Sequence, residues 1–392
     1  MTRRVAFAAV GGAGWLGGQN YLRNLIWVLR LYGTPRLEPV VFAGTDAAGT
    51  SLQSVCVGVG IECITSADFD GDRLRRRAFA TILRGRDMIS QAHFQAARAD
   101  AVFEAGSYLG WRSAVPIISW YPDFQHKHLP AMFQASDRFR RDLLLRARMA
   151  GPRQFMLSSR AAEADCLRFF PAAAGRTIAV PFAVLPTGGP DEDGAAILAK
   201  YTIGGSYVFL PNQFWRHKNH TVVIEALRLL KQRGCPVQVV ASGLQCDMRD
   251  PSHFPALETL ISDAGIGDNF RMLGVIPYTD LTTLMGNAAA VLNPSLFEGW
   301  STTVEESRAM GVPMLLSDIP VHREQMAEGA DYFPPHDAEA LAALLSRFPP
   351  NQPLPDDASR RNRARAGQRE RMHAFADRFL EATERAIAGH RS

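Results

Sequence analysis

The chain has 392 residues, of which 47% are hydrophobic and 21% charged, and its formal net charge is +4. This length predicts two domains of ordinary size, and the composition is that of a globular protein. The sequence has no apolar run of the ~20 residues that a membrane-spanning helix needs. Its five cysteines form no C-x-x-C pair, which indicates free thiols in a reducing cytoplasm and no zinc site.

The first half of the chain alternates short apolar runs with helical patterns. Two arginines and an apolar run at the N-terminus superficially resemble a signal peptide, but the run is too short and leads into a glycine loop, so we expect a strand at 5–10. A helix is predicted over 20–31, where leucines and an isoleucine share one face. The remaining apolar runs predict strands at 38–44, 100–106, 115–123 and 153–159, and a helix at 160–169.

Basic residues concentrate in this first half. Residues 1–190 hold 23 basic and 14 acidic residues, so the rest of the chain is net acidic. The arginines form either solvated helix faces or a surface attracted to anionic lipid headgroups or a polyanionic acceptor. Nucleic acid is not expected as a partner, because aromatic residues are not interleaved with the arginines. The two main groups are Arg73, Arg75, Arg76, Arg77, Arg84 and Arg86, and Arg138, Arg140, Arg141, Arg146 and Arg148.

A stretch rich in Pro, Gly and Asp separates the two halves and predicts an interdomain linker at 186–204. The alternation then restarts, with strands predicted at 207–213, 236–243, 270–276 and 313–318 and a helix at 220–233. The pattern predicts two doubly wound α/β domains, 1–185 and 205–365, that face each other across a cleft. Ligands of such sheets bind beyond the carboxyl ends of the strands.

Two glutamates, Glu298 and Glu306, stand with seven residues between them in the stretch 295–317. An apolar strand precedes Glu298, and a segment of helical pattern begins between the two. The first N–H groups of a helix lack internal partners and form an anion site. The flanking carboxylates repel phosphate but accept hydrogen bonds from hydroxyls. The pattern therefore predicts a ligand with phosphate in its middle and hydroxyls at both ends, such as a nucleotide sugar.

The same stretch resembles the E-x7-E signature of the retaining family-4 glycosyltransferases, which have the GT-B fold of two Rossmann-like domains. The matching positions are Pro294, Ser295, Glu298, Gly299, Glu306, Gly311 and Pro313. The resemblance is strong over residues 207–322 and looser over 5–170. In proteins of this fold a C-terminal helix often crosses back to the first domain, which is expected here for residues 366–392.

The resemblance implies roles for the residues of this stretch. Glu306 is expected to accept hydrogen bonds from the ribose hydroxyls and Glu298 from the transferred sugar. The backbone N–H groups that follow Glu298 are expected to hold the diphosphate together with Lys218. No cofactor and no metal is implied, because the lysine and the helix dipole take that role. The N–H groups belong to Gly299, Trp300, Ser301 and Thr302.

Lys218 lies in a segment, 211–227, that resembles the family's second phosphate-binding element. There the pattern has an arginine five residues before the lysine, and this chain has Gln213 instead. Glutamine donates a hydrogen bond but carries no charge, so the diphosphate loses a cationic partner. Arg216 or His217 could supply the missing charge.

Further cleft residues are implied in both halves. Asp123 matches an aspartate at a strand tip where the family often has His-Asp, but Pro122 replaces the histidine and His126 lies three residues beyond. The alternative for Asp123 is a helix cap, and a metal site at His126 and His128 lacks a third ligand. The donor is also expected to lie near Gly17, Gly18, Gly243 and Ile276.

Two other functions remain open from the sequence. Residues 12–17 satisfy G-x-G-x-x-G after a strand, which alone would indicate an NAD-dependent oxidoreductase, but the expected acidic residue is poorly placed because Asp46 comes late. The replacements Gln213 and Pro122 would also fit a non-catalytic protein that binds a sugar nucleotide.

The two motifs most resemble those of bacterial cell-surface polysaccharide transferases, including mannosyl- and rhamnosyltransferases. The resemblance implies transfer of a hexose, of mannose type, from a nucleotide diphosphate sugar. The expected acceptor is a glycan or a lipid-linked glycan in cell-surface polysaccharide synthesis. The protein is expected in the cytoplasm, peripherally at the inner face of the membrane.

Overall fold

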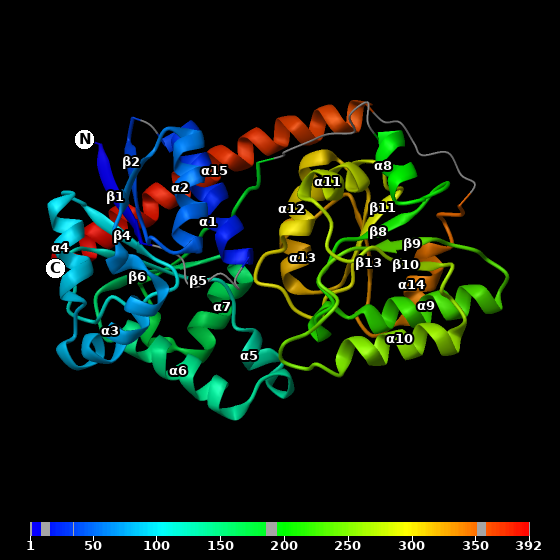
Figure 1. Cartoon of the computed structure of the whole chain (residues 1–392), viewed down its shortest axis with the longest axis horizontal. Coiled ribbons are helices and arrows are strands. Elements are labelled where there is room, and N and C mark those ends of the chain that lie inside the picture. The colour runs from blue at the N-terminus through cyan, green and yellow to red at the C-terminus, as the bar shows by residue number, and fades with distance from the viewer. Residues whose placement is uncertain (1, 9–15, 34, 186–193, 351–357, 392) are drawn as a thin grey trace. The chain divides into compact units, whose positions relative to one another are not determined.

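The computed structural model describes residues 2–8, 16–33, 35–185, 194–350 and 358–391. The chain divides into two compact units, each built around one sheet with helices packed about it (Figure 1). Unit 1 comprises residues 1–124, 135–185 and 370–392, and unit 2 comprises 125–134 and 186–369. The segment 125–134, which lies between two stretches of unit 1 in the sequence, thus groups with unit 2.

Unit 1 contains a seven-stranded parallel sheet in the order β3-β2-β1-β4-β5-β6-β7. Strand order reverses between β1 and β4, which sets the topological switch point of this sheet. The inner strands are mostly buried apolar runs, as expected where helices cover both faces of a parallel sheet, whereas the edge strands are partly exposed. They are β1 (Arg3–Ala8), β2 (Leu37–Ala43), β3 (Glu62–Thr65), β4 (Ala101–Glu104), β5 (Ile117–Tyr121), β6 (Arg153–Leu157) and β7 (Thr177–Ala179).

The helices of unit 1 begin at polar caps where the sequence supplies them. Asp46, Asp87 and Ser159 each accept a hydrogen bond from a backbone N–H of the following first turn. The main helices are α1 (Leu16–Val28), continued by a π-helical turn (Leu29–Gly33), α2 (Ala47–Val59), α3 (Gly71–Arg84), α4 (Met88–Ala96), α6 (Ala135–Met149) and α7 (Arg160–Phe169).

The last helix, α15 (Ala358–Arg391), is divided between the two units, with residues up to 369 in unit 2 and the rest in unit 1. In unit 1 the buried Phe379 stacks on Phe7 of β1, with ring centroids 5.6 Å apart, and Glu384 pairs with Arg3 at 2.7 Å. In unit 2 the backbone of Arg360 approaches Gly311 so closely that a Cβ there would lie 3.1 Å from its carbonyl oxygen. Gly311 also has φ +71, so glycine fits this position for two independent reasons.

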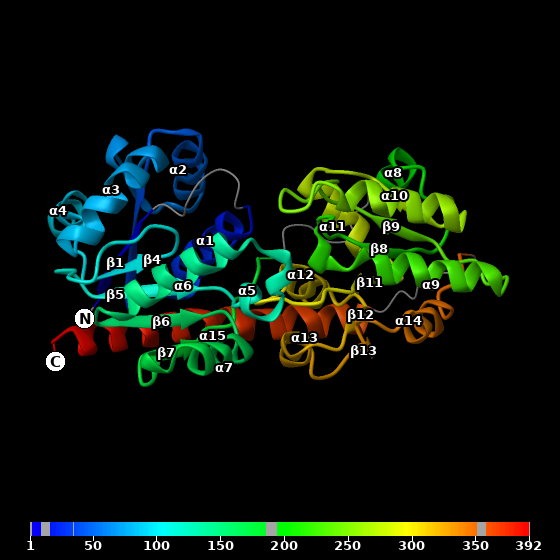
Figure 2. The same cartoon turned by 90° about the horizontal axis from the view of Figure 1, so that it is seen from below.

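Unit 2 repeats the architecture with a six-stranded parallel sheet in the order β10-β9-β8-β11-β12-β13. Its switch point lies between β8 and β11. The strands are β8 (Val208–Leu210), β9 (Val239–Ala241), β10 (Phe270–Met272), β11 (Ala290–Asn293), β12 (Met314–Ser317) and β13 (Ala330–Phe333). Its helices, which Figure 2 shows from below, are α5 (Gln125–His128), α8 (Gly194–Lys200), α9 (His220–Gln232), α10 (His253–Ala264), α11 (Tyr278–Gly286), α12 (Thr302–Met310), α13 (Pro320–Gln325) and α14 (Ala338–Leu345).

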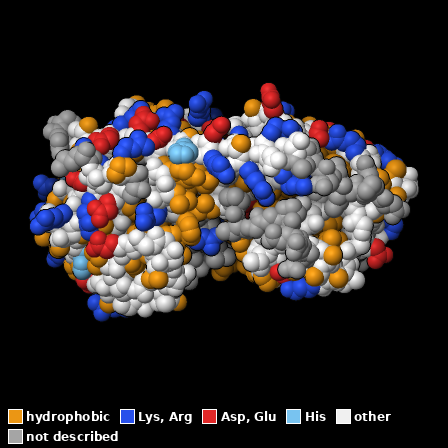
Figure 3. Space-filling view, turned by 90° about the horizontal axis from the view of Figure 1, so that it is seen from above, with side chains coloured by type: hydrophobic (Ala, Val, Ile, Leu, Met, Phe, Trp, Pro, Cys, Tyr) orange, Lys and Arg blue, Asp and Glu red, His pale blue; other side chains and the backbone are white. Residues whose placement is uncertain are grey.

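The two sheets confirm the predicted fold class of two doubly wound α/β domains. Every predicted strand and helix is present with ends shifted by a few residues, and the helix predicted at 160–169 is α7. Within the predicted linker, residues 186–193 lie outside the described residues and the remainder begins with α8. Residues 9–15, which hold most of the first glycine loop, also lie outside them. On the face drawn in Figure 3, acidic and basic side chains are intermixed.

Candidate functional site

The candidate site lies at the switch point of unit 2, where the loops after β8 and β11 meet. Asn212, two residues past β8, donates from its side chain to the Asn293 side chain at the end of β11 over 3.2 Å. The Leu296 N–H donates to the His217 carbonyl over 2.8 Å, and the Asn219 side chain donates to the Pro294 carbonyl over 3.0 Å. These bonds fix the two loops against each other without any ligand.

Lys218 and Glu298, one from each loop, form an ion pair inside this assembly. The Lys218 ammonium lies 2.5 Å from Glu298 Oε1, and the side chains are 13% and 10% exposed. The Ser295 hydroxyl donates to the same oxygen over 2.7 Å. The structure therefore brings together the lysine and the first glutamate of the two sequence motifs, which are 80 residues apart.

The pKa of Glu298 shows which effect dominates at this pair. Burial raises the pKa of the carboxyl, but the charge and the hydrogen bond of Lys218 outweigh it and lower the pKa to about 2. Glu298 is thus ionised at neutral pH, so it can accept hydrogen bonds from hydroxyls but cannot supply a proton as a general acid.

A buried polar network positions the helix that follows Glu298. Ser301 caps α12, accepting from the Val304 N–H and from the Asn293 side chain at 2.8 Å. The Gln325 side chain accepts from the Ser301 N–H and donates to its carbonyl, both over 3.0 Å. The amides of Thr302 and Thr303 then have no acceptor within the helix. This nine-residue helix therefore presents its positive end beside the ion pair.

Glu306 lies on α12, one turn beyond this end, and its side chain is 9% exposed. It accepts a 2.7 Å hydrogen bond from the hydroxyl of Tyr278, the first residue of α11. The adjacent Glu305 is fully buried and instead contacts Gln325 and Arg308. Of the two consecutive glutamates, Glu306 is the one on the α11 side.

Gln213, predicted as a donor-binding residue, forms a hydrogen bond between two loops of unit 2. Its side-chain oxygen accepts from the Leu244 N–H over 2.6 Å, which ties the loop after β8 to the loop after β9. The two loops also approach each other closely at Gly243, where a Cβ would lie only 2.4 Å from the Asn212 carbonyl oxygen. Ile276 is half-buried against the core of unit 2, and the adjoining Gly274 accepts from the Gly243 N–H over 2.9 Å.

Of the two cations considered as substitutes for the missing arginine, His217 is neutral. Burial and the neighbouring charge of Lys218 lower its pKa to about 3. Arg216 lies over half exposed and faces Asp250 at 3.7 Å. A third cation, Arg249, contacts His217 Nδ1 at 3.3 Å and stacks near Trp215 and Phe133. Sequence reasoning missed Arg249, because it belongs to no motif and only the fold brings it beside His217.

His322 was also missed. It is fully buried on α13, its Nδ1 contacts the Ser317 carbonyl oxygen at 2.9 Å, and its Nε2 has no hydrogen-bond partner. Burial lowers its pKa, so the ring is neutral, although the charge of Glu298 acts on it in the opposite direction. Ser317 donates in turn to the Ser295 carbonyl over 2.6 Å, which links α13 to the loop that carries Glu298.

The residues predicted in the first half fall in different places. Asp123 is half-buried and follows β5 in unit 1, whereas the buried His126 belongs to α5, which groups with unit 2. There the ring of His128 lies 5.0 Å from that of Phe297, and Arg249 donates to the Gln125 side chain over 3.0 Å. The segment around His126 therefore packs against the loop of Glu298. No metal-binding cluster of His, Cys, Asp or Glu occurs among the residues that the structure describes.

The glycine loop of unit 1 is only partly visible. Residues 12–15 lie outside the described part of the chain, so the structure does not place the proposed dinucleotide fingerprint. Gly17 and Gly18 lie in the first turn of α1, and Gly18 is buried.

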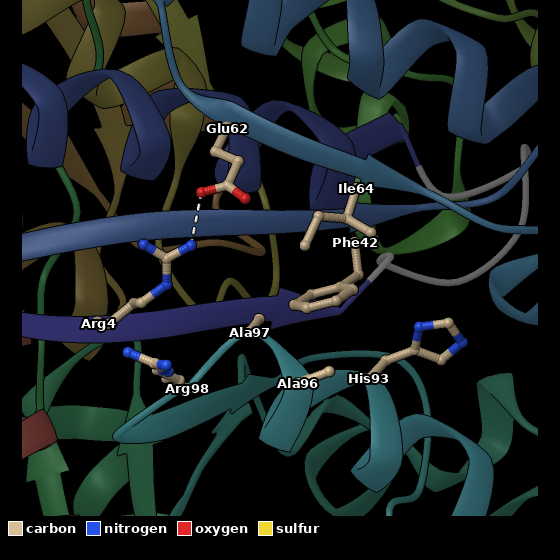
Figure 4. Close-up of a pocket in the computed structure, with 8 residues that line it drawn as sticks. All are labelled: Arg4, Phe42, Glu62, Ile64, His93, Ala96, Ala97 and Arg98. Atoms are coloured by element: carbon tan, nitrogen blue, oxygen red, sulfur yellow. Dashed lines mark hydrogen bonds and ion pairs between the residues drawn. The ribbon is translucent and has the colours of Figure 1, made fainter.

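A cavity of about 430 Å³ in unit 1 lies away from this chemistry. Side chains of β1, β2 and β3 and of the end of α4 line it, including Phe42 and Ile64 (Figure 4). Two of its polar groups have partners, since Arg4 pairs with Glu38 and Glu62, and His93 lies 3.0 Å from Asp68. We therefore assign the functional site to the switch point of unit 2.

Comparisons with known proteins find one matching family and many solved structures of similar fold. Residues 203–365 match the family described as Glycosyl transferases group 1. Two curated relatives are the O-antigen chain mannosyltransferase RfbU of Salmonella typhimurium, 30% identical over 107 residues, and the amylovoran biosynthesis glycosyltransferase AmsK of Erwinia amylovora, 32% identical over 136. The matches span 27% and 32% of this chain and only 30% and 32% of those relatives.

Solved structures match over nearly the whole chain. HepE of Anabaena, crystallised with UDP and glucose, has a TM-score of 0.65 at 16% identity, over 97% of this chain and 99% of its own. A glycosyltransferase of Rickettsia africae has a TM-score of 0.64 at 16% identity, over 97% of this chain and 96% of its own. Sucrose-phosphate synthase of Thermosynechococcus elongatus has a TM-score of 0.65 at 18% identity, over 98% of this chain and 99% of its own. At these identities the likeness establishes the fold, which is GT-B.

Proposed function

We propose that this protein is a retaining glycosyltransferase that moves a hexose, of mannose type, from a nucleotide diphosphate sugar to a glycan or lipid-linked acceptor in polysaccharide synthesis. The observation that carries the proposal is the buried Lys218–Glu298 pair beside the positive end of α12. The similarity of part of this chain to an O-antigen mannosyltransferase and an amylovoran glycosyltransferase supports the choice of sugar and product class.

In this proposal the donor diphosphate binds at the first amides of α12 and beside the Lys218 ammonium. Both are fixed before the donor arrives, so little reorganisation is needed as charge develops on the leaving group. Glu298 accepts hydrogen bonds from hydroxyls of the transferred sugar, and Glu306 accepts them from the ribose. The Tyr278 hydroxyl positions the Glu306 carboxylate by donating a hydrogen bond to it. Arg249 supplies the cationic character that Gln213 lacks.

The transfer step breaks the bond between the anomeric carbon and the β-phosphate oxygen. The acceptor hydroxyl oxygen bonds to the same face of that carbon, and its proton passes to the departing phosphate. Glu298 remains ionised throughout, since its pKa is about 2. The charge of the leaving group is balanced by the lysine and the helix end, so the proposal requires no metal ion and no cofactor.

A donor panel tests the proposal. The full chain is incubated with GDP-mannose, UDP-glucose, UDP-galactose and dTDP-rhamnose, with and without EDTA, and release of nucleoside diphosphate is measured. We expect turnover with one donor, GDP-mannose, unaffected by EDTA, and a Lys218→Met variant slower by roughly 10²-fold. The exposed Val57→Ser is the matched control. Binding of a donor without turnover, under any acceptor tried, would instead favour the non-catalytic alternative.

The proposed setting is the cytoplasm, at the inner face of the membrane. Among the residues that the structure describes, no helix is both long and apolar enough to cross a bilayer.

A further inference from the structure

Helix α3 of unit 1 turns its apolar side chains toward solvent. Phe79, Ile82 and Leu83 are 71%, 53% and 69% exposed, and their spacing places them on one stripe. The opposite side of the helix carries the buried Thr81 and the largely buried Arg77, which donates to Asp87 over 3.1 Å. This is the reverse of an ordinary surface helix, whose apolar stripe faces the core.

Helix α6 of the same unit shows a second apolar stripe. Phe139, Leu143 and Leu144 are 69%, 56% and 36% exposed, although the same helix also contributes Leu145 and Met149 to the core. The exposed leucines and phenylalanine are therefore surplus to the packing of α6. Contiguous exposed apolar side chains of this kind mark interaction sites.

Arginines flank both stripes. Arg75, Arg76 and Arg84 are exposed on α3, and Arg140, Arg141 and Arg146 on α6. The acidic residues are few, with Asp72 on α3 and Asp137 and Asp142 on α6, so each helix is strongly net positive. The face in Figure 3, where acidic side chains accompany the basic ones, lacks this one-sided charge.

One loop contacts the C-terminal ends of both helices. Arg112 donates from its N–H to the Gly85 carbonyl at the end of α3 over 2.6 Å, and the Tyr108 hydroxyl donates to the Ala147 carbonyl in the last turn of α6 over 3.2 Å. Trp111, in the same loop, is 39% exposed. Both helices lie along the lower side of unit 1 in Figure 1 and are uncovered in Figure 2.

We propose that this surface, formed by the exposed stripes of α3 and α6 with Trp111, docks unit 1 on an anionic lipid bilayer. The apolar side chains would enter the boundary between headgroups and acyl chains, while the arginines reach the headgroup phosphates. Charge decides among the occupants, because a second copy of the chain would place arginines against arginines. The inference concerns unit 1 alone and stands independently of sugar transfer at unit 2.

Vesicle sedimentation tests the proposal with the full chain and no donor or acceptor. Vesicles of phosphatidylcholine are compared with vesicles that contain about 30% phosphatidylglycerol. We expect binding to the anionic vesicles that is weakened by salt, and little binding to the neutral ones. The double variants Phe79→Ser/Leu83→Ser and Phe139→Ser/Leu143→Ser should each reduce binding roughly tenfold or more. Arg75→Gln/Arg76→Gln should reduce it roughly tenfold on anionic vesicles only.

Val57→Ser is the matched control, since Val57 is an 80% exposed apolar residue on α2 of the same unit. Its vesicle binding should equal that of the parent chain, and circular dichroism checks that every variant is folded. Absence of binding to anionic vesicles, or equal binding by the stripe variants, would overturn the proposal. Self-association that the stripe variants abolish, without vesicle binding, would assign the surface to a second copy and overturn it as well.

Discussion

Each unit places a buried carboxylate at or just after the strand that borders its switch point, and the two carboxylates are built for different tasks. Glu104 ends β4 in unit 1, and Glu298 follows β11 in unit 2. Both have a pKa of about 2, because nearby cations outweigh the effect of burial. The lowered pKa alone therefore does not distinguish a structural carboxylate from a functional one.

The partners distinguish them. Glu104 is fully buried and accepts from Arg153 through both oxygens, from the Leu109 N–H and from the Ser119 hydroxyl, each within 3.1 Å. Arg148 adds a second guanidinium at 3.7 Å. Glu298 has one lysine and one serine on Oε1, keeps some exposure, and stands at a helix N-terminus. A closed network stabilises a fold, whereas a partly open one can exchange partners with a ligand.

The largest expected effect is on stability at Glu104. Glu104→Gln should lower the free energy of unfolding by about 3–5 kcal/mol, because it leaves Arg153 and Arg148 buried without a counter-charge. Guanidinium unfolding measures this loss, with the half-exposed Glu38→Gln as control. A loss below about 1 kcal/mol would mean that the two carboxylates do not differ as described.

The complementary change, Glu298→Gln, should act on catalysis. Transfer should slow by roughly 10²–10³-fold, while the dissociation constant of the nucleoside diphosphate changes little, because the lost hydrogen bonds are to the sugar. Initial rates and calorimetric nucleotide titration separate the two quantities. The exposed Glu328→Gln provides the control. An equal loss of rate in Glu298→Gln and Glu328→Gln would show that Glu298 is not part of the site.

The two units should also differ in their response to acid. His217 and His220, both in unit 2, have pKa values of about 3, in each case chiefly because burial disfavours the charged ring. Since these pKa values lie below the unfolded value of 6.5, their contribution is present above pH 6.5 and is lost as pH falls toward 3. Each histidine should cost about 1.4 kcal/mol per pH unit in that window.

Unfolding at pH 7, 6 and 5 checks this slope, with His220→Leu as the variant. The variant should lose stability more gradually than the parent as pH falls. Parallel pH profiles of the two proteins would show that His220 does not remain neutral in the fold.

The smallest expected effect compares two serine caps. Ser159→Ala on α7 and Ser301→Ala on α12 should each cost about 1 kcal/mol of stability, since each removes a side-chain acceptor for a first-turn N–H. Only Ser301→Ala should raise the KM for the donor, because only α12 has its N-terminus at the proposed phosphate site. Thermal unfolding and initial rates measure both effects. Unchanged donor kinetics in Ser301→Ala would argue against phosphate at this helix end.

The sequence by itself determined the two doubly wound domains and the succession of strands and helices along the chain, and over residues 207–322 it resembles the glycosyltransferases. Apolar runs bounded by polar tips, together with the spacing of Glu298 and Glu306, are local signals that need no tertiary information. The lysine was found in the same way, by its register with a strand and a helix.

Only the tertiary structure decided which of these groups meet. Strand pairing brings together loops that are far apart in sequence. It therefore sets the distance from Lys218 to Glu298 and the contact of Gln213 with the loop after β9. It also places Arg249 and His322 near these residues. Likewise, the arginines of α3 and α6 could be read as solvated faces until burial was known. Exposure is a property of the packed molecule, so the apolar stripes beside those arginines became visible only once the core was filled.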